Sequence, residues 1–383
     1  MKWLIENGLV LLDDDSMQET TLSIEDGRLF GFACGKSRRF HAENLLVLPG
    51  IIDIHGDAFE RDLRPRPSAI FPKDIAVADT DRRIVANGIT TAYYALTCTW
   101  EPGLRSMESA REFIKAFDAI RPKLGGDVKL HIRFEIHHHE ALDDIAQWME
   151  AGQVDLLAFN DHLSHQESKM ADPVALAEYL DRTGLSAKDF RDMFSRVKER
   201  EPEALKGVEK LAAVARERGV RMASHDEETP DIRAWYHDLG CSICEFPCNR
   251  ETALAARDMG DHVVMGAPNA LKGVSLYERL SARVGVRDRL CTILASDYYY
   301  PAQLHAAFLM KALDFCSLAD AWKLVSTNPA EALGLDDRGK ISVGRRADLV
   351  LVDDSDPFKP RVAATMVAGR WAYISPSDLS RLA

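Results

Sequence analysis

No run of apolar residues in this chain reaches the ~20 residues that a membrane-spanning helix needs. The opening stretch MKWLIENGLVLL is interrupted by Glu6 and Asn7 and is followed by no cleavage pattern of a secretory signal, so we expect a mature N-terminus. Internal repeats and low-complexity segments are also lacking. With 46% hydrophobic and 28% charged residues among 383, the composition is that of a soluble globular protein.

An excess of basic residues is lacking as well. The chain has 48 Lys and Arg against 60 Asp and Glu, a formal net charge of -12. Nucleic acids and anionic membranes are bound by net basic surfaces, so this balance argues against both as partners. A small anionic substrate must then be met by a local basic cluster. A homodimer is the default expectation for the oligomeric state.

Cysteines are few, odd in number (seven) and scattered. A chain of this length needs no disulfides, so we expect reduced thiols and a cytoplasmic location. Cys241, Cys244 and Cys248 have a spacing found in metal sites. They lie in an apolar run without a nearby fourth thiol, which favours their interpretation as small core residues.

Short apolar runs alternate with longer amphipathic ones, a pattern typical of βα units around a parallel sheet. Eight such runs are expected to be strands: 48–55, 90–96, 130–136, 156–161, 220–226, 242–247, 263–269 and 291–297. Eight strands of this kind predict an α/β fold, a (β/α)8 barrel of the TIM type.

The two ends of the chain have a different texture, with strand-like runs and turns but no long helix. We therefore predict a small β-sandwich domain built from residues 1–47 and 340–383, and a barrel spanning 48–339. Residues 163–205 are polar and helix-prone, and they are too many for an ordinary loop. They are expected to form a helical insertion, either peripheral or acting as an active-site lid.

Metal-binding residue types occur where five of the predicted strands end. They are His55 and Asp57, Glu135, His162, His225 with Asp226, and Asp297. In a (β/α)8 barrel these ends meet at one rim, where catalytic groups lie. A single buried histidine or carboxylate is usually structural. So many at one rim would be costly to bury without a cation, and this indicates a metal site.

The order of these residues resembles the amidohydrolase superfamily: a His-x-Asp pair on the first strand, a carboxylate on the fourth, histidines after the fifth and sixth, and an aspartate on the eighth. The segment 327–353 is similar to the one with which these enzymes leave the barrel. LPGIIDIHGDAFE, ASHDEE, EFP, MGAPN and ASDYYYP resemble the branch that acts in phosphonate metabolism, the ribose 1-methylphosphonate 5-triphosphate diphosphatases.

The resemblance implies two divalent metal ions, with zinc expected and manganese or iron as alternatives. It implies six ligands: His55, Asp57 and Asp297 on the more buried ion, His162 and His225 on the second, and Glu135 as the bridge. Two such ions activate water and polarise a carbonyl or phosphoryl oxygen. Asp297 is then expected to be the catalytic residue that takes a proton from the water and returns it to the leaving group.

Basic and amide groups near the rim are candidates for substrate binding. Arg64 and Arg66, with Arg61, lie in the first rim loop, and guanidinium groups match phosphate oxygens well. Asn269 and Lys272 follow the seventh strand. The alternative is that the arginines pair with neighbouring acids and that Lys272 is simply exposed.

Two hypotheses for the reaction remain. The first is hydrolysis of a phosphoanhydride in a ribose 1-phosphonate 5-triphosphate-like substrate, with release of pyrophosphate. The second is hydrolysis of an amide, cyclic amide or N-acyl group, the commoner chemistry of the superfamily. Residues 272–277 favour this second hypothesis. They read KGVSLY in place of the basic Gly-Gly-Ser-His loop of the diphosphatases, so fewer anion-binding groups remain. A barrel used only for binding would have lost ligands, and none of the six is missing.

Two further groups invite a metal interpretation. His137, His138 and His139 are consecutive, and successive strand residues face opposite sides, so we expect at most one to contact substrate and the others to lie at the surface. Glu228 stands three residues after His225, a spacing that resembles the proton-shuttling glutamate of deaminases. The Glu135 position favours two metals instead.

Overall fold

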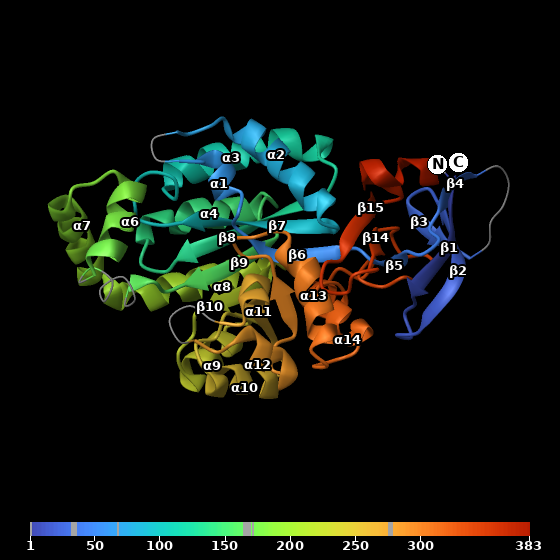
Figure 1. The fold of residues 1–383 in the computed structure, drawn as a ribbon. Coiled ribbons are helices and arrows are strands. Elements are labelled where there is room, and N and C mark those ends of the chain that lie inside the picture. Colours follow the sequence, from blue (N-terminus) through green and yellow to red (C-terminus); the bar gives the residue numbers. More distant parts are fainter. Residues whose placement is uncertain (1, 32–36, 67–68, 164–169, 171, 275–278) are drawn as a thin grey trace.

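Eight parallel strands form the centre of the molecule and curve into a nearly closed barrel (Figure 1). The computed structural model describes the chain except for residues 1, 32–36, 67–68, 164–169, 171 and 275–278. In order around the barrel the strands are β6 (Ile51–Gly56), β7 (Ile89–Cys98), β8 (Asp127–Glu135), β9 (Leu156–Asn160), β10 (Arg221–His225), β11 (Ile243–Glu245), β12 (His262–Gly266) and β13 (Ile293–Ala295). A bridge between Gly56 and Asp297 returns the last strand to the first, and the predicted barrel is confirmed.

Helices surround the barrel (Figure 1). They are α2 (Lys73–Ala86), α3 (Met107–Ile120), α4 (Leu142–Glu150), α8 (Ala204–Arg218), α9 (Pro230–Asp238), α10 (Arg250–Asp258), α11 (Ala267–Lys272), α12 (Ala282–Arg287), α13 (Ala302–Ala312), α14 (Leu318–Lys323) and α15 (Thr327–Leu333). Side-chain caps start several of them. Ser106 accepts a hydrogen bond from the backbone of Ser109 at α3, and Asn249 does the same for Thr252 at α10.

The inside of the barrel is apolar at one end and polar at the other. Below the rim, aliphatic side chains such as Ile54, Leu156 and Val264 form a core that includes Ala330 and Leu333 of α15. The helix therefore closes the end of the barrel where the strands begin. Polar side chains are gathered at the opposite end, where the strands finish, as expected for a (β/α)8 enzyme.

Both ends of the chain build a second, separate sheet (Figure 1). Its strands are β1 (Lys2–Leu11), β2 (Met17–Glu25), β3 (Arg28–Phe30), β4 (Arg38–His41), β5 (Leu46–Pro49), β14 (Leu349–Asp353), β15 (Arg361–Val367) and β16 (Arg370–Ile374). The first half of β1 pairs with β4 and the second half with β5, with an irregularity between Ile5 and Gly8. A strand that changes partners in this way is typical of a sandwich, and the predicted β-sandwich is confirmed.

Charged and polar contacts join the sandwich to the barrel. Arg338 donates to Asp127 at 2.5 Å and Arg346 to the same carboxylate oxygen at 3.2 Å. Trp322 is buried and donates its indole N–H to the carbonyl of Pro49 at 2.9 Å. These bonds fasten the sandwich to the side of the barrel away from the polar rim.

The segment predicted as a helical insertion holds α6 (Pro173–Thr183), α7 (Ala187–Glu199) and the short helix η3 (Glu201–Glu203). The first two lie at the end of the molecule opposite the sandwich (Figure 1). Phe190 and Phe194 of α7 pack against Trp100, which follows β7. Of the helices that the structure describes, none is long and apolar enough to cross a membrane.

Candidate metal centre

The six predicted ligands lie around the polar rim of the barrel. His55, Glu135 and His225 are the last or nearly last residues of β6, β8 and β10, and each is buried. His162 follows β9. The strand numbers expected from the resemblance are corrected by one: Glu135 ends the third barrel strand, His162 follows the fourth and His225 ends the fifth, because β8 to β10 occupy those places in the barrel.

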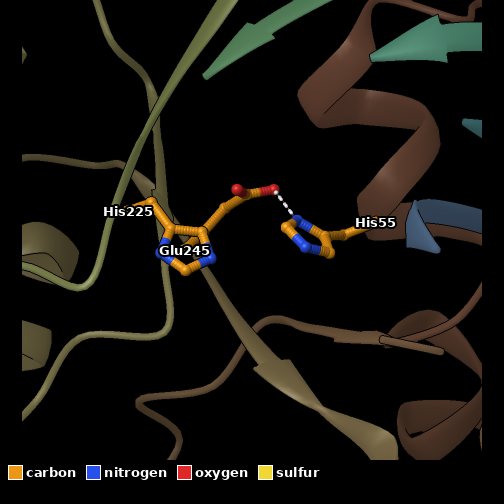
Figure 2. Close-up of side chains that lie close together, drawn as sticks. All are labelled: His55, His225 and Glu245. Carbon is orange, nitrogen blue, oxygen red and sulfur yellow. Dashed lines mark hydrogen bonds and ion pairs between the residues drawn. The ribbon is translucent and has the colours of Figure 1, made fainter. Parts of the chain in front are cut away.

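A buried carboxylate joins two of the histidines. One ligand atom of each of His55, His225 and Glu245 lies within 4.8 Å of the others (Figure 2). The Nδ1 atom of His55 is 2.9 Å from Oε1 of Glu245, and the side chain of Glu245 is fully buried. A carboxylate that accepts the Nδ1–H of a neutral histidine leaves Nε2 as the atom directed to a metal.

His225 also belongs to a second cluster. Its ligand atoms lie within 4.8 Å of those of His162 and Asp226. The Nδ1 atom of His225 is 3.3 Å from Oδ1 of Asp226, and Arg279 is bonded to the same carboxylate. One imidazole therefore belongs to two clusters of candidate ligands.

Glu135 is held close to His162. The backbone N–H of His162 donates to Oε1 at 3.2 Å, and its Nδ1 lies 3.0 Å from Oε2. Glu135 also forms a third cluster with His137 and Asp161. Glu135, which is expected to bridge the two metal ions, therefore lies beside the second cluster of candidate ligands.

Asp57 and Asp297 are neighbours through their backbones. The N–H of Asp297 donates to His55 at 2.8 Å, and the N–H of Asp57 donates to Asp297 at 3.0 Å. The side chains of Asp297 and Asn269 both lie against Gly266. A Cβ atom added to this glycine would be 3.2 Å from Oδ2 of Asp297 and 3.4 Å from Nδ2 of Asn269. Among the described residues, neither carboxylate belongs to a cluster of three ligand atoms within 4.8 Å.

The backbone at three strand ends takes a conformation that is rare for side-chain-bearing residues. Asp226, Phe246 and Asp297 have φ of 61°, 54° and 55°. Each of them donates its N–H across the barrel to the next strand, to Glu245, Val264 and His55 respectively. Such strain is retained where the surrounding structure enforces it, and it turns the chain at the rim so that side chains face the site.

Burial lowers the pKa values of the site histidines and raises those of the carboxyl groups. It lowers the pKa of His162 to about 3 and holds that of His55 well below its usual range. It raises the pKa of Glu135 to about 8 and that of Asp297 to about 8, with the charge of Asp57 adding to the second shift. The histidines are neutral and able to coordinate a metal, and a bound cation would favour the ionised form of the carboxyl groups.

The residues present fit a metal centre. Within the described chain, Oε2 of Glu245 is buried without a hydrogen-bond partner. Unpaired buried ligand atoms of this kind are rare unless something else satisfies them. Imidazole and carboxylate together suit zinc, manganese or iron.

The predicted substrate-binding residues are not gathered at one place. Arg64 donates to the carbonyl and carboxylate of Asp181 at 2.8 and 3.2 Å, which ties the first rim loop to α6. Arg66 and Lys272 are exposed, and Asn269 is half-buried beside Asp297. Residues 275–278 of the loop that departs from the diphosphatase pattern lie outside the described residues.

The interpretation of the histidine run as mostly surface is wrong. His137 and His138 are 4% and 9% exposed, and His137 lies 3.1 Å from Asp161. They are buried because the chain turns inward after β8 instead of continuing as a strand. Glu228 is exposed, whereas its neighbour Glu227 is buried against Arg233 at 3.0 Å. Cys241 and Cys244 are buried in the core.

Two residues of the site escaped the sequence reasoning. Glu245 interrupts an otherwise apolar strand, so it had a visible signal. Arg133 stands two residues before Glu135 on β8, which places it on the same face of the strand. The alternation of polar residues along 127–135 would have identified it.

Comparison with known proteins identifies the family of the chain. A family model described as amidohydrolase family matches residues 307–373. The chain is 33% identical over 368 residues to the alpha-D-ribose 1-methylphosphonate 5-triphosphate diphosphatase of Escherichia coli (strain K12), which covers 92% of this chain and 96% of the relative.

Solved structures share the fold at low identity. A prolidase complexed with N-methylphosphonate-L-proline has a TM-score of 0.64 at 14% identity, covering 98% of this chain and 100% of its own. The N-acetylglucosamine-6-phosphate deacetylase of Pasteurella multocida has a TM-score of 0.63 at 11% identity, covering 97% and 99%. Likeness at such identities concerns the fold alone.

The barrel, its polar rim and these matches define a metal-dependent hydrolase. The resemblance found in the motifs is confirmed. The chain belongs to the amidohydrolase superfamily, in the family of the ribose 1-methylphosphonate 5-triphosphate diphosphatases.

Proposed function

We propose that the protein hydrolyses a phosphoanhydride in a ribose 1-phosphonate 5-triphosphate-like substrate and releases pyrophosphate. The observation that carries the proposal is the 33% identity to a diphosphatase over 96% of that enzyme's length. A match that also spans 92% of this chain extends well beyond a single motif or domain. Similarity of this extent supports a shared reaction more than a shared fold alone does.

The six predicted ligands are proposed to hold two divalent ions, with Glu245 and Asp226 supporting the histidines. Such ions would activate a water molecule and polarise a phosphoryl oxygen. Asp297 accepts the proton of the attacking water at its carboxylate. A new P–O bond forms at the first phosphorus of the chain, the P–O bond to the second breaks, and Asp297 returns the proton to the departing pyrophosphate.

Substrate contacts are proposed for the basic and amide groups of the rim. Asn269 stands beside Asp297, where its amide can donate to a phosphate oxygen. Arg66 and Lys272 are exposed and able to reach a charged ligand. Arg64 can bind the substrate only after it breaks its hydrogen bond to Asp181.

Amide hydrolysis stays as the second candidate because the basic groups of the rim are largely paired. Arg64 is bonded to Asp181, Arg105 to both oxygens of Glu60 and Arg279 to Asp226. A neutral amide needs fewer free cations than a triphosphate does.

The test is an assay of the metal-loaded protein against ribose and nucleoside triphosphates, with N-acyl and cyclic amides in parallel. Pyrophosphate release that falls by at least ~10³-fold in Asp297→Asn is the expected result. Asp314→Asn is the matched control, because Asp314 has a similar φ of 57° at an exposed position. Release of amine without pyrophosphate would replace the proposal with the second candidate.

A further inference from the structure

The strand that carries Glu135 has one polar face. Residues Val128, Leu130, Ile132 and Phe134 of β8 belong to the core between the barrel and its helices. The alternate positions point into the barrel and are Asp127, Lys129, His131, Arg133 and Glu135. Arg133 is therefore fixed by the strand at the level of the candidate ligands.

The guanidinium of Arg133 spans the candidate metal centre. Its Nη1 donates to Oδ2 of Asp57 at 3.2 Å, and its Nη2 lies 3.3 Å from Nε2 of His225. The residue is 6% exposed, and its Nε has no hydrogen-bond partner among the described residues. A buried cation thus joins a ligand proposed for one metal to a ligand proposed for the other.

The two atoms that face the guanidinium of Arg133, Oδ2 of Asp57 and Nε2 of His225, are also atoms that could coordinate a metal ion. The Nδ1 of His225 faces Asp226, so Nε2 presents its lone pair, and it can serve either a guanidinium N–H or a metal ion. Like charges a few ångströms apart repel each other, and more strongly when they are buried. Arg133 and bound divalent ions therefore compete for the same place.

We propose that Arg133 gives up Asp57 and His225 when metal binds and then holds the phosphate chain of the substrate. The inference rests on the proposed function and deepens it. A guanidinium displaced from its carboxylate inside a buried site needs a new anion, and its fork matches two phosphate oxygens. A neutral amide substrate would leave this charge uncompensated.

The first experiment measures zinc binding by competition with a chelator. Arg133→Met is expected to bind zinc at least ~10-fold more tightly than the unaltered protein, since the competing cation is gone. Lys129→Met is the matched control. It removes a positive charge from the same face of the same strand, four residues and about 13 Å away. Equal zinc affinity in the unaltered protein and Arg133→Met would overturn the competition.

The second experiment measures tripolyphosphate binding to the zinc-loaded proteins by calorimetry. Arg133→Met is expected to lose at least ~10-fold in affinity, as for a buried charged contact, and Lys129→Met to be unchanged. Arg133→Lys keeps the charge without the fork and should fall between them; it also serves if the methionine variant does not fold. Undiminished tripolyphosphate binding by Arg133→Met and Arg133→Lys would overturn the inference.

The two proposals fail in different ways. Tripolyphosphate binding that depends on Arg133, in a protein that splits only amides, would overturn the phosphoanhydride reaction and keep Arg133 as an anion-binding residue. If the protein releases pyrophosphate but its tripolyphosphate affinity does not change when Arg133 is replaced, the proposed reaction stands and the role of Arg133 in substrate binding is wrong.

Discussion

The imidazole of His55 and the carboxylate of Glu245 meet at 2.9 Å inside the barrel, although the two residues lie 190 positions apart in the chain. Both side chains are almost fully buried. The pair sets the direction of His55, because the hydrogen bond at Nδ1 leaves only Nε2 for a metal.

Removal of the Glu245 charge should therefore weaken metal binding. Glu245→Gln is expected to lower zinc affinity by about 10- to 100-fold, the usual effect of a lost carboxylate partner of a ligating histidine. Chelator competition measures the change. Asp378→Asn, which alters a buried aspartate of the sandwich, should leave zinc affinity as it is. An unchanged affinity in Glu245→Gln would show that His55 is oriented by other contacts.

The stability of the metal-free protein should fall as pH rises from 7.5 to 9. The folded-state pKa values of Glu135 and Asp297 are raised to about 8, above those of the unfolded chain, so folding binds protons in this range and stability declines. The site histidines have lowered pKa values, and above pH 7.5 they are largely neutral in the unfolded chain as well. Urea unfolding at several pH values measures the slope.

Metal and mutation provide the controls for that slope. Zinc should remove the decline, because it favours the ionised carboxylates. Asp297→Asn should make it shallower, since one of the two groups can no longer titrate. A slope that is the same in Asp297→Asn would assign the decline to groups outside the site.

Trp100 should hold the helices of the insertion. It packs on Phe190 and Phe194 with ring centroids 6.3 and 6.2 Å apart. Trp100→Ala is expected to cost about 3–5 kcal/mol locally and to open α6 and α7 to proteolysis. Zinc affinity should persist, because none of the six ligands lies on these helices. Cleavage confined to other segments would contradict this assignment.

Asp127 should control the joint between barrel and sandwich. It receives both Arg338 and Arg346, and the side chain of Arg338 is 7% exposed. Asp127→Asn leaves a buried guanidinium poorly compensated, and we expect a loss of about 3 kcal/mol in the free energy of unfolding. Denaturant unfolding measures it. Lys340→Gln, which alters an exposed contact to Glu331 at 3.6 Å, should change stability by less than ~0.5 kcal/mol.

Much of the fold could be predicted because its signals are local. Each barrel strand is a short apolar run, and a run such as 156–160 is buried on both faces whatever its neighbours are. The end of β8 could not be predicted, because the turn that buries His137 and His138 depends on α4 and on Asp161.

The candidate site was predictable residue by residue but not as a set of contacts. His55 and Glu135 are recognisable because polar residues that end apolar strands gather at one rim. Which ligands lie together was not recognisable. Glu245 and Asp226 pair with the histidines through the barrel register, and Arg133 reaches Asp57 across two strands. Arg64 meets Asp181 because α6, which is distant in sequence, lies against the first rim loop.

By itself the sequence determined the barrel, the terminal sandwich and the residue types at the rim, since hydrophobic periodicity and the ends of strands are written along the chain. Tertiary structure alone decided that His225 serves two clusters, that Glu245 orients His55 and that a guanidinium stands among the ligands. These relations depend on distances between residues far apart in the sequence, and only closure of the barrel brings those residues together.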